Sequence, residues 1–218
     1  MDLPTMVGEG ARAALELLIE GNERYVAGRA AHPRQDDARR AATSGDQRPF
    51  AAVMSCADSR VPPEVLFDQG LGDLFCVRTA GQVADGAAVG SLELAVMLYQ
   101  VPLLVVLGHT GCGAVLVTLD HLRSPGQLPG SVSSIVWAIT PAAREARRQA
   151  ADDAWDLAVE LNVAATVTQL AESRPTLAGA VTRRELAVVG AVYDLRSGEV
   201  RWQVPCSPTP CDADVRTM

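Results

Sequence analysis

The sequence has few aromatic residues and no long apolar stretch. Phe, Tyr and Trp make up 4% of the 218 residues, so a core must be filled mainly by Ala, Val and Leu, and the hydrophobic fraction of 48% is ample for this. No segment approaches the roughly 20 apolar residues that a bilayer-spanning helix needs. Residues 1–10 lack the basic segment and apolar stretch of a signal peptide. We therefore expect a cytoplasmic protein without a membrane partner.

The chain also lacks an excess of basic residues and an even number of cysteines. Its 19 Lys and Arg against 26 Asp and Glu give a net charge of −7. This balance argues against a nucleic-acid partner, because nucleic-acid-binding proteins usually present a basic face. Five cysteines argue against a complete intramolecular disulfide framework, so thiols are available to bind a metal ion.

The length of 218 residues favours one domain. We expect this domain to span residues 1–204, with an N-terminal helix and arm over residues 1–49. Residues 205–218 are expected to be a flexible tail. The tail holds Cys206 and Cys211 among prolines, in a spacing that fits no common zinc turn.

Short apolar runs alternate with helical patterns along most of the chain. Unbroken runs of this length suit strands that are buried on both faces, as in parallel sheets. The sequence therefore predicts an α/β fold with a central, mostly parallel sheet of about four parallel strands and an antiparallel edge strand, flanked by helices. The expected strands are 50–55, 74–79, 103–107, 186–194 and the edge strand 199–204, and the expected helices are 11–27, a short one from Pro62, 92–100, 114–122, 132–149 with a break near Pro141, 154–172 and 176–184. The polar residues 30–49 predict a mainly extended arm.

Metal-binding side chains follow directly on two of the expected strands. Cys56 comes after the apolar run 50–54, and His109 and Cys112 come after the run 102–108. If these strands are parallel neighbours, their carboxyl ends lie at one edge of the sheet, where open α/β sheets place their sites. Two thiolates and one imidazole then converge in a set typical of catalytic zinc, with the fourth position open. A chance cluster of three buried residues is the alternative, and the placement after two strands disfavours it.

Asp58 and Arg60 continue the first motif. Asp58 lies two residues after Cys56, so on an extended chain both side chains point to the same side. Two roles for Asp58 compete. It accepts a hydrogen bond from zinc-bound hydroxide, or it occupies the fourth zinc position in a closed, inactive state. An ion pair with Arg60 would hold the carboxylate off the metal.

C-x-D-x-R at residues 56–60 and H-x-x-C at 109–112, each after a buried strand, resemble the motif pair of the β-class carbonic anhydrases. The resemblance extends from Ala14 to Val200. Further matching segments are 20–25 with 28–29, 59–62, 72–75 with 77–78, and 108–109 with 111–113. The resemblance implies a Zn²⁺-dependent lyase that reversibly hydrates carbon dioxide to bicarbonate and a proton. It also implies that zinc-bound hydroxide attacks the substrate and that the Asp58–Arg60 dyad orients it.

The resemblance also implies an assembly and a substrate pocket. In the family the N-terminal helix and arm pack on a partner subunit, so we expect a homodimer or homotetramer. Carbon dioxide or bicarbonate would contact Gln47, contributed across the interface, and the backbone amide of Gly113. Phe75 and Ala80 match apolar wall positions, and Leu94 falls where plant-like members carry tyrosine. Without the resemblance, Gln47 is an exposed loop residue and the three apolar residues are ordinary core.

The chain departs from one subgroup of this family. The bicarbonate-inhibited members build a second anion site from tryptophan, arginine and tyrosine, and the matching positions here are Val53, Arg78 and Tyr193. The missing tryptophan argues against that regulation. Two other functions stay open: a hydrolase of carbonyl sulfide or carbon disulfide that uses the same zinc site, and a non-enzymatic zinc protein, against which the intact Asp58–Arg60 dyad argues.

Overall fold

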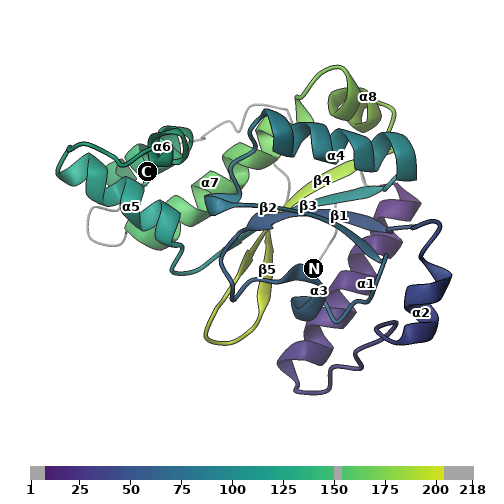
Figure 1. Ribbon diagram of the computed structural model, residues 1–218. Coiled ribbons are helices and arrows are strands. Elements are labelled where there is room, and N and C mark those ends of the chain that lie inside the picture. The colour runs from purple at the N-terminus through teal and green to yellow at the C-terminus, as the bar shows by residue number, and fades with distance from the viewer. Residues whose placement is uncertain (1–7, 150–153, 204–218) are drawn as a thin grey trace, which may run out of the picture.

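The structure, a computed structural model that describes residues 8–149 and 154–203, is built around one five-stranded sheet. The strands are β1 (Ala51–Cys56), β2 (Leu74–Thr79), β3 (Leu103–His109), β4 (Ala187–Tyr193) and β5 (Val200–Gln203). Their order across the sheet is β2-β1-β3-β4-β5, as Figure 1 shows. The first four strands pair in parallel and β5 pairs antiparallel with β4. The predicted sheet, including its antiparallel edge, is confirmed.

Helices cover both faces of this sheet. They are α1 (Glu9–Val26), α2 (Asp37–Ala42), α3 (Pro63–Leu66), α4 (Gly86–Tyr99), α5 (Gly113–Arg123), α6 (Val132–Gln149), α7 (Ala154–Ala171) and α8 (Thr176–Thr182), with a 3₁₀ turn, η1 (Ala80–Gln82). In Figure 1, α1 and α3 lie on one face, α4, α7 and α8 lie on the other, and α5 and α6 extend to one side. Among the described residues, no helix combines the length and the apolar character that crossing a bilayer requires.

The two central strands, β1 and β3, are buried along their whole length. Their side chains alternate between the two faces. Met54 and Cys56 therefore belong to the core under α4, α5, α6 and α7, while Val53 belongs to the core under α1 and α3. Ala, Val and Leu supply most of both cores, as the low aromatic content predicts.

Helix α1 and the arm pack against their own chain. Ala11, Leu15 and Leu18 are buried in the core under α1. Arg24 pairs with Asp68 at 2.6 Å. These contacts leave the expected packing on a partner subunit untested, so that arrangement stays a prediction.

The arm is less extended than the sequence predicts, because it contains the short helix α2. Asp36 caps this helix by accepting a hydrogen bond from the backbone N–H of Arg39 at 2.8 Å. The sequence of α2 contains three alanines after the acidic cap, but it lacks the apolar stripe that would have predicted a helix.

Two helix predictions were wrong in detail. Helix α4 begins at Gly86 rather than at residue 92, because the Asp85 side chain accepts a hydrogen bond from the N–H of Ala88 at 2.9 Å. Helix α6 runs without interruption through Pro141, and the buried side chains on either side of it, Ile139 and Ala142 among them, hold the helix against α5 and α7. The predicted tail, with Cys206 and Cys211, lies outside the described residues.

Candidate metal centre

Cys56, His109 and Cys112 meet at the carboxyl edge of the sheet. Cys56 is the last residue of β1, His109 is the last residue of the adjacent strand β3, and Cys112 is the N-cap of α5. All three side chains are buried. The two sulfur atoms lie 4.0 Å apart, and the three donor atoms all lie within 4.8 Å of one another. Each of the three residues offers one ligand atom, so this group could hold a metal ion.

The His109 ring is oriented as a metal ligand requires. Its Nδ1 lies 2.9 Å from the backbone carbonyl oxygen of Thr110. Because a carbonyl can only accept a hydrogen bond, Nδ1 carries the proton and donates it, and Nε2 keeps its lone pair. Nε2 is fully buried and has no hydrogen-bond partner in the described part of the chain. A buried nitrogen of this kind, beside two sulfurs, fits a metal ion of the zinc type.

The two thiols affect each other strongly. The neighbouring Cys112 side chain lowers the pKa of Cys56 below its ordinary value, against the opposing effect of burial. The Cys56 sulfur and burial in turn raise the pKa of Cys112. One sulfur therefore ionises readily and the second resists, because two buried negative charges 4.0 Å apart repel each other. A cation between the sulfurs would stabilise both as thiolates.

Asp58 lies beside the ligands but is held by Arg60. The Arg60 guanidinium donates from Nε to Asp58 Oδ1 at 2.9 Å and from Nη2 to Oδ2 at 2.8 Å. This fork keeps the pKa of Asp58 well below its usual range. The carboxylate oxygen Oδ2 is 3.9 Å from His109 Nε2. In this structure the carboxylate is therefore paired with Arg60 and ionised, close to the ligand set.

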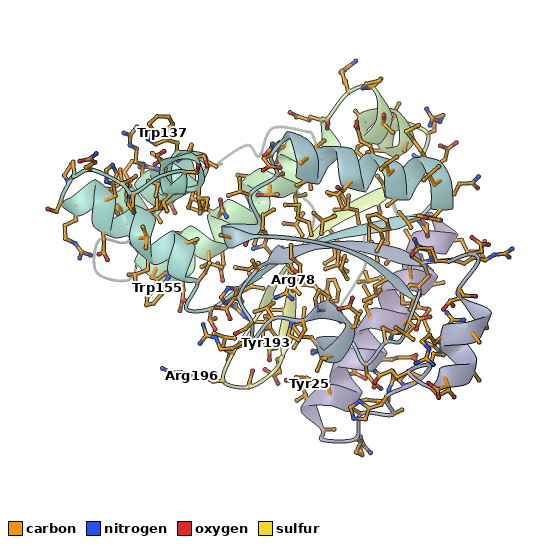
Figure 2. The ribbon with its side chains drawn as sticks, viewed as in Figure 1. Tyr25, Arg78, Trp137, Trp155, Tyr193 and Arg196 are labelled. Atoms are coloured by element: carbon orange, nitrogen blue, oxygen red, sulfur yellow. The ribbon has the colours of Figure 1, made fainter. Side chains whose placement is uncertain are left out.

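Arg78 supports the same loop in a way that the sequence did not suggest. From β2 its Nε donates to the carbonyl oxygen of Cys56 at 3.1 Å, and its Nη2 donates to the carbonyl oxygen of Asp58. Every residue has a backbone carbonyl, so a hydrogen bond to one cannot be recognised from the residue types in the sequence. Only the folded structure reveals this contact. In Figure 2, Arg78 lies on the same side of the sheet as Tyr193 and Tyr25, whose hydroxyl oxygens are 3.4 Å apart.

The structure brings two of the five expected pocket residues next to the ligands. Ala80 follows Thr79, which pairs with Cys56 in the sheet. Gly113 follows Cys112 directly and begins α5.

The other three expected pocket residues lie elsewhere on the same chain. Gln47 precedes β1 and donates to the hydroxyl of Tyr99 at 2.9 Å. Phe75 packs beside the same Tyr99 ring, with ring centroids 5.9 Å apart. Leu94, on α4, is about half exposed. Gln47 and Phe75 therefore lie near the amino ends of β1 and β2, opposite the end that carries Cys56.

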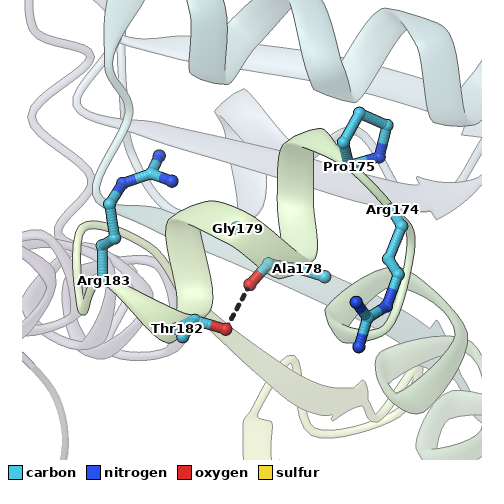
Figure 3. A pocket seen from close by; sticks show the side chains of 6 residues that line it. All are labelled: Arg174, Pro175, Ala178, Gly179, Thr182 and Arg183. Atoms are coloured by element: carbon cyan, nitrogen blue, oxygen red, sulfur yellow. Dashed lines mark hydrogen bonds between the residues drawn. The ribbon is translucent and has the colours of Figure 1, made fainter.

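A separate pocket near α8 contains none of these residues. It has a volume of about 300 Å³ and is shown in Figure 3. Its lining consists of Arg174, Pro175, Ala178, Gly179, Thr182 and Arg183. Of the two arginines in this lining, Arg183 is paired with Glu185 at 2.9 Å.

Comparisons with known proteins agree with the geometry of the ligand set. A family model described as carbonic anhydrase matches residues 51–200. A carbonic anhydrase of Mycolicibacterium smegmatis is 45% identical over 189 residues, which cover 86% of this chain and 91% of that protein. Carbonic anhydrase 2 of Mycobacterium tuberculosis is 44% identical and covers 85% of this chain and 89% of its own length.

Solved structures of β-carbonic anhydrases share the fold. The Coccomyxa β-carbonic anhydrase in complex with acetazolamide has a TM-score of 0.64 at 32% identity and covers 86% of this chain and 85% of its own. The β-carbonic anhydrase CcaA has a TM-score of 0.68 at 25% identity and covers 86% of this chain and 94% of its own. The family model covers the strands and helices that carry Cys56, His109 and Cys112, and the sequence identity to known carbonic anhydrases extends over most of the chain. This protein therefore belongs to the β-class carbonic anhydrases.

Proposed function

We propose that this chain catalyses the reversible hydration of carbon dioxide to bicarbonate and a proton, with zinc held by Cys56, His109 and Cys112. The observation that carries the proposal is the convergence of the three donor atoms within 4.8 Å, with the Asp58–Arg60 pair alongside. Membership of the carbonic anhydrase family supports the same reaction. A structural zinc site typically has four protein ligands and does not need an ionised carboxylate beside it, whereas the group found in residues 8–149 and 154–203 has three ligands and lies beside Asp58.

Zinc suits this donor set because two thiolates and one imidazole are among its preferred ligands. When bound, the ion supplies Lewis acidity that makes water a nucleophile near neutral pH. The protein contributes the orientation. The Thr110 carbonyl fixes the His109 tautomer, and the backbone N–H of Gly81 donates to the Cys56 sulfur at 3.4 Å.

Asp58 is proposed as the hydrogen-bond acceptor that orients the reacting oxygen. Its low pKa keeps it ionised at every pH where the enzyme would work, so it accepts hydrogen bonds and does not donate them. The two-pronged contact with Arg60 fixes the direction of both carboxylate oxygens. Loss of this contact would free the carboxylate to bind the metal and close the site, as the sequence predicts.

Carbon dioxide carries no charge, so its pocket is expected to be apolar. We propose that Ala80 and the backbone amide of Gly113 belong to this pocket, together with Phe75, Leu94 and Gln47. At about 3.3 Å per residue, the ends of β1 lie roughly 17 Å apart, so Gln47 near the first end does not reach the ligands of its own chain. A partner subunit that contributes Gln47 resolves this separation, which supports a homodimer or homotetramer.

We also propose a cytoplasmic setting for this enzyme. Cys56 and Cys112 lie close together and must both stay reduced to bind a metal ion. A reducing compartment preserves such thiols, whereas an oxidising one favours disulfides.

Stopped-flow measurement of carbon dioxide hydration, on protein whose metal content has been determined, tests the proposed function. We expect about one zinc per chain and a rate that follows zinc occupancy. The same preparation offered carbonyl sulfide or carbon disulfide tests the alternative reaction. Zinc-loaded protein that does not hydrate carbon dioxide would contradict the proposal.

A further inference from the structure

We propose that helix α7 is a common brace for the three metal ligands, with Trp155 and Asn162 as positioning residues. The proposal rests on the proposed zinc site and adds what holds that site together. The ligands come from two strands and the turn after the second, so no single element fixes all three. Helix α7 lies across this region and contacts β3, β4 and α5.

Asn162 supports Cys56 through one intermediate residue. Its side chain is almost fully buried, at 5% exposure, and its Nδ2 donates to the carbonyl oxygen of Gly81 at 3.0 Å. The N–H of the same Gly81 donates to the Cys56 sulfur at 3.4 Å. Gly81 has a φ of +66°, which suits glycine, so the turn that aims this N–H at the sulfur is sharply defined. Asn162 therefore fixes the position of a hydrogen-bond donor to a ligand.

Trp155 supports Cys112. Its indole Nε1 donates to the carbonyl oxygen of Cys112 at 3.1 Å. That carbonyl also accepts the first backbone hydrogen bond of α5, from Leu116 at 3.1 Å. The ligand therefore sits between two helices, as the N-cap of one and the hydrogen-bond partner of the other. Trp155 and Asn162 are seven residues apart, so they lie on one face of α7 two turns from each other.

The same helix packs against the residue before His109. A Cβ atom added at Gly108 would lie 2.5 Å from Val163 Cγ2 and 3.3 Å from Val159 Cγ1. Glycine at this position is therefore what allows α7 to approach β3 so closely. Helix α7 therefore contacts all three proposed ligands, directly or through a neighbour. It reaches Cys112 at its backbone carbonyl, His109 through the preceding Gly108, and Cys56 through Gly81.

A brace of this kind affects metal binding more than folding. The three donor residues come from separate elements and the two sulfurs lie 4.0 Å apart, so surrounding contacts must hold the donor atoms in place for a metal ion. Groups that contact ligands without touching the metal typically change metal affinity by about 10- to 100-fold when removed. Trp155 occupies this position for Cys112, and Asn162 acts on Cys56 through Gly81, which donates to the sulfur.

The test compares zinc affinity in three variants by competition with a chromogenic chelator. Asn162→Leu and Trp155→Phe each remove one hydrogen-bond donor and keep most of the apolar volume. Gln169→Leu is the matched control, because Gln169 on the same helix also donates to a backbone carbonyl, that of Ala84 at 2.8 Å, and contacts no ligand. We expect zinc to bind about 10- to 100-fold more weakly to the first two variants and within about twofold of wild type to the control.

Thermal unfolding of the metal-free and zinc-loaded forms separates positioning from plain packing. A positioning role reduces the rise in melting temperature that zinc produces, because that rise depends on zinc affinity. A packing role lowers both melting temperatures equally and leaves the rise unchanged. Trp155→Phe keeps an aromatic ring in place, so it carries the test if Asn162→Leu fails to fold.

The outcomes distinguish this proposal from the proposed function. Wild-type zinc affinity in both Asn162→Leu and Trp155→Phe, or an equal loss in Gln169→Leu, would overturn the brace while leaving carbon dioxide hydration untouched. A wild-type protein that binds no zinc would overturn the metal site itself.

Discussion

Cys112 is both a proposed metal ligand, in the turn after β3, and the N-cap of α5. We predict that Cys112→Ser loses most of the zinc, because a serine hydroxyl does not ionise near neutral pH and is a poor zinc ligand. The measurement is zinc content per chain after dialysis against metal-free buffer. Cys76→Ser is the matched control, since Cys76 is a free thiol in β2 outside the ligand set, and it should keep about one zinc per chain. Full zinc occupancy in Cys112→Ser would show that the ligand set is wrong.

Arg60 controls where the Asp58 carboxylate points. We predict that Arg60→Ala lowers the hydration rate by roughly 100-fold while zinc content stays near one per chain, because a small displacement of a reacting or orienting group has an effect of that size. Stopped-flow rates and metal analysis of the same sample provide the measurement. Arg123→Ala removes an exposed ion pair with Asp120 elsewhere on the surface and should leave the rate unchanged. A wild-type rate in Arg60→Ala would rule out the proposed role of the pair.

The residues of the candidate metal group could be picked out from the sequence, but the residues that contact their backbone could not. Cysteine and histidine after buried strands have few other uses, so Cys56 and His109 stood out. Arg78 and Asn162 act on backbone carbonyls, which every residue carries. Their partners depend on which strands and helices become neighbours, and that information appears only in the folded chain.

Among the secondary-structure elements, the central strands were the easiest to predict. The fully buried strands β1 and β3 give unbroken apolar runs that loops and exposed helices do not. Helix boundaries were harder, because they depend on single caps. Asp85 caps α4, which begins at Gly86, six residues before the predicted start at residue 92, and Asp36 caps α2 in a segment without an apolar stripe.

Asp68 connects the segment after α3 with α1 and with the arm. Its carboxylate pairs with Arg24 of α1 and accepts hydrogen bonds from the backbone N–H groups of Ala31 and His32. Burial raises the pKa of Asp68, but the three hydrogen-bond donors together lower it by more than burial raises it. The pKa of Asp68 is therefore below its ordinary value. A pKa below that of the unfolded chain stabilises the fold above about pH 4, and this stabilisation is lost as pH falls through the folded pKa. Asp68→Asn should therefore lose about 2–4 kcal/mol of unfolding free energy at pH 7.

Urea unfolding between pH 7 and pH 2.5 checks this prediction. The difference between wild type and Asp68→Asn should be largest at neutral pH and should shrink as the wild-type carboxylate becomes protonated. Asp37→Asn is the control, because Asp37 forms an exposed pair with Arg40 and should change stability by less than about 0.5 kcal/mol. A difference between wild type and Asp68→Asn that did not vary with pH would contradict the charge-based explanation.

At the scale of the whole molecule, the residues expected to form the site lie at opposite edges of the sheet of one chain. Cys56, His109 and Cys112 lie at the carboxyl edge of the sheet, whereas Gln47 is bonded to Tyr99 near the opposite edge. The fold of one chain therefore brings the candidate metal ligands together, and the proposed substrate contact by Gln47 would have to come from a second copy. Two inactive variants, one without Gln47 and one without a metal ligand, should therefore restore each other's activity in a mixed dimer.

We predict that Gln47→Ala and Cys112→Ser, each strongly impaired alone, recover activity when both chains are produced together. In a two-fold dimer with one chain of each kind, the Gln47→Ala chain keeps its zinc ligands and receives Gln47 from its partner. Each mixed dimer has one complete site of two, so isolated mixed dimers should have about half of wild-type activity, and the unfractionated sample, in which random assortment makes about half of the dimers mixed, should have about a quarter. The measurement is the hydration rate of mixed dimers isolated through two different affinity tags. Asp58→Ala with Cys112→Ser is the control pair, because both defects affect residues that act on the same chain's metal site, and it should stay inactive. If the first pair also stays inactive, although mixed dimers form and bind zinc, Gln47 does not act across the interface.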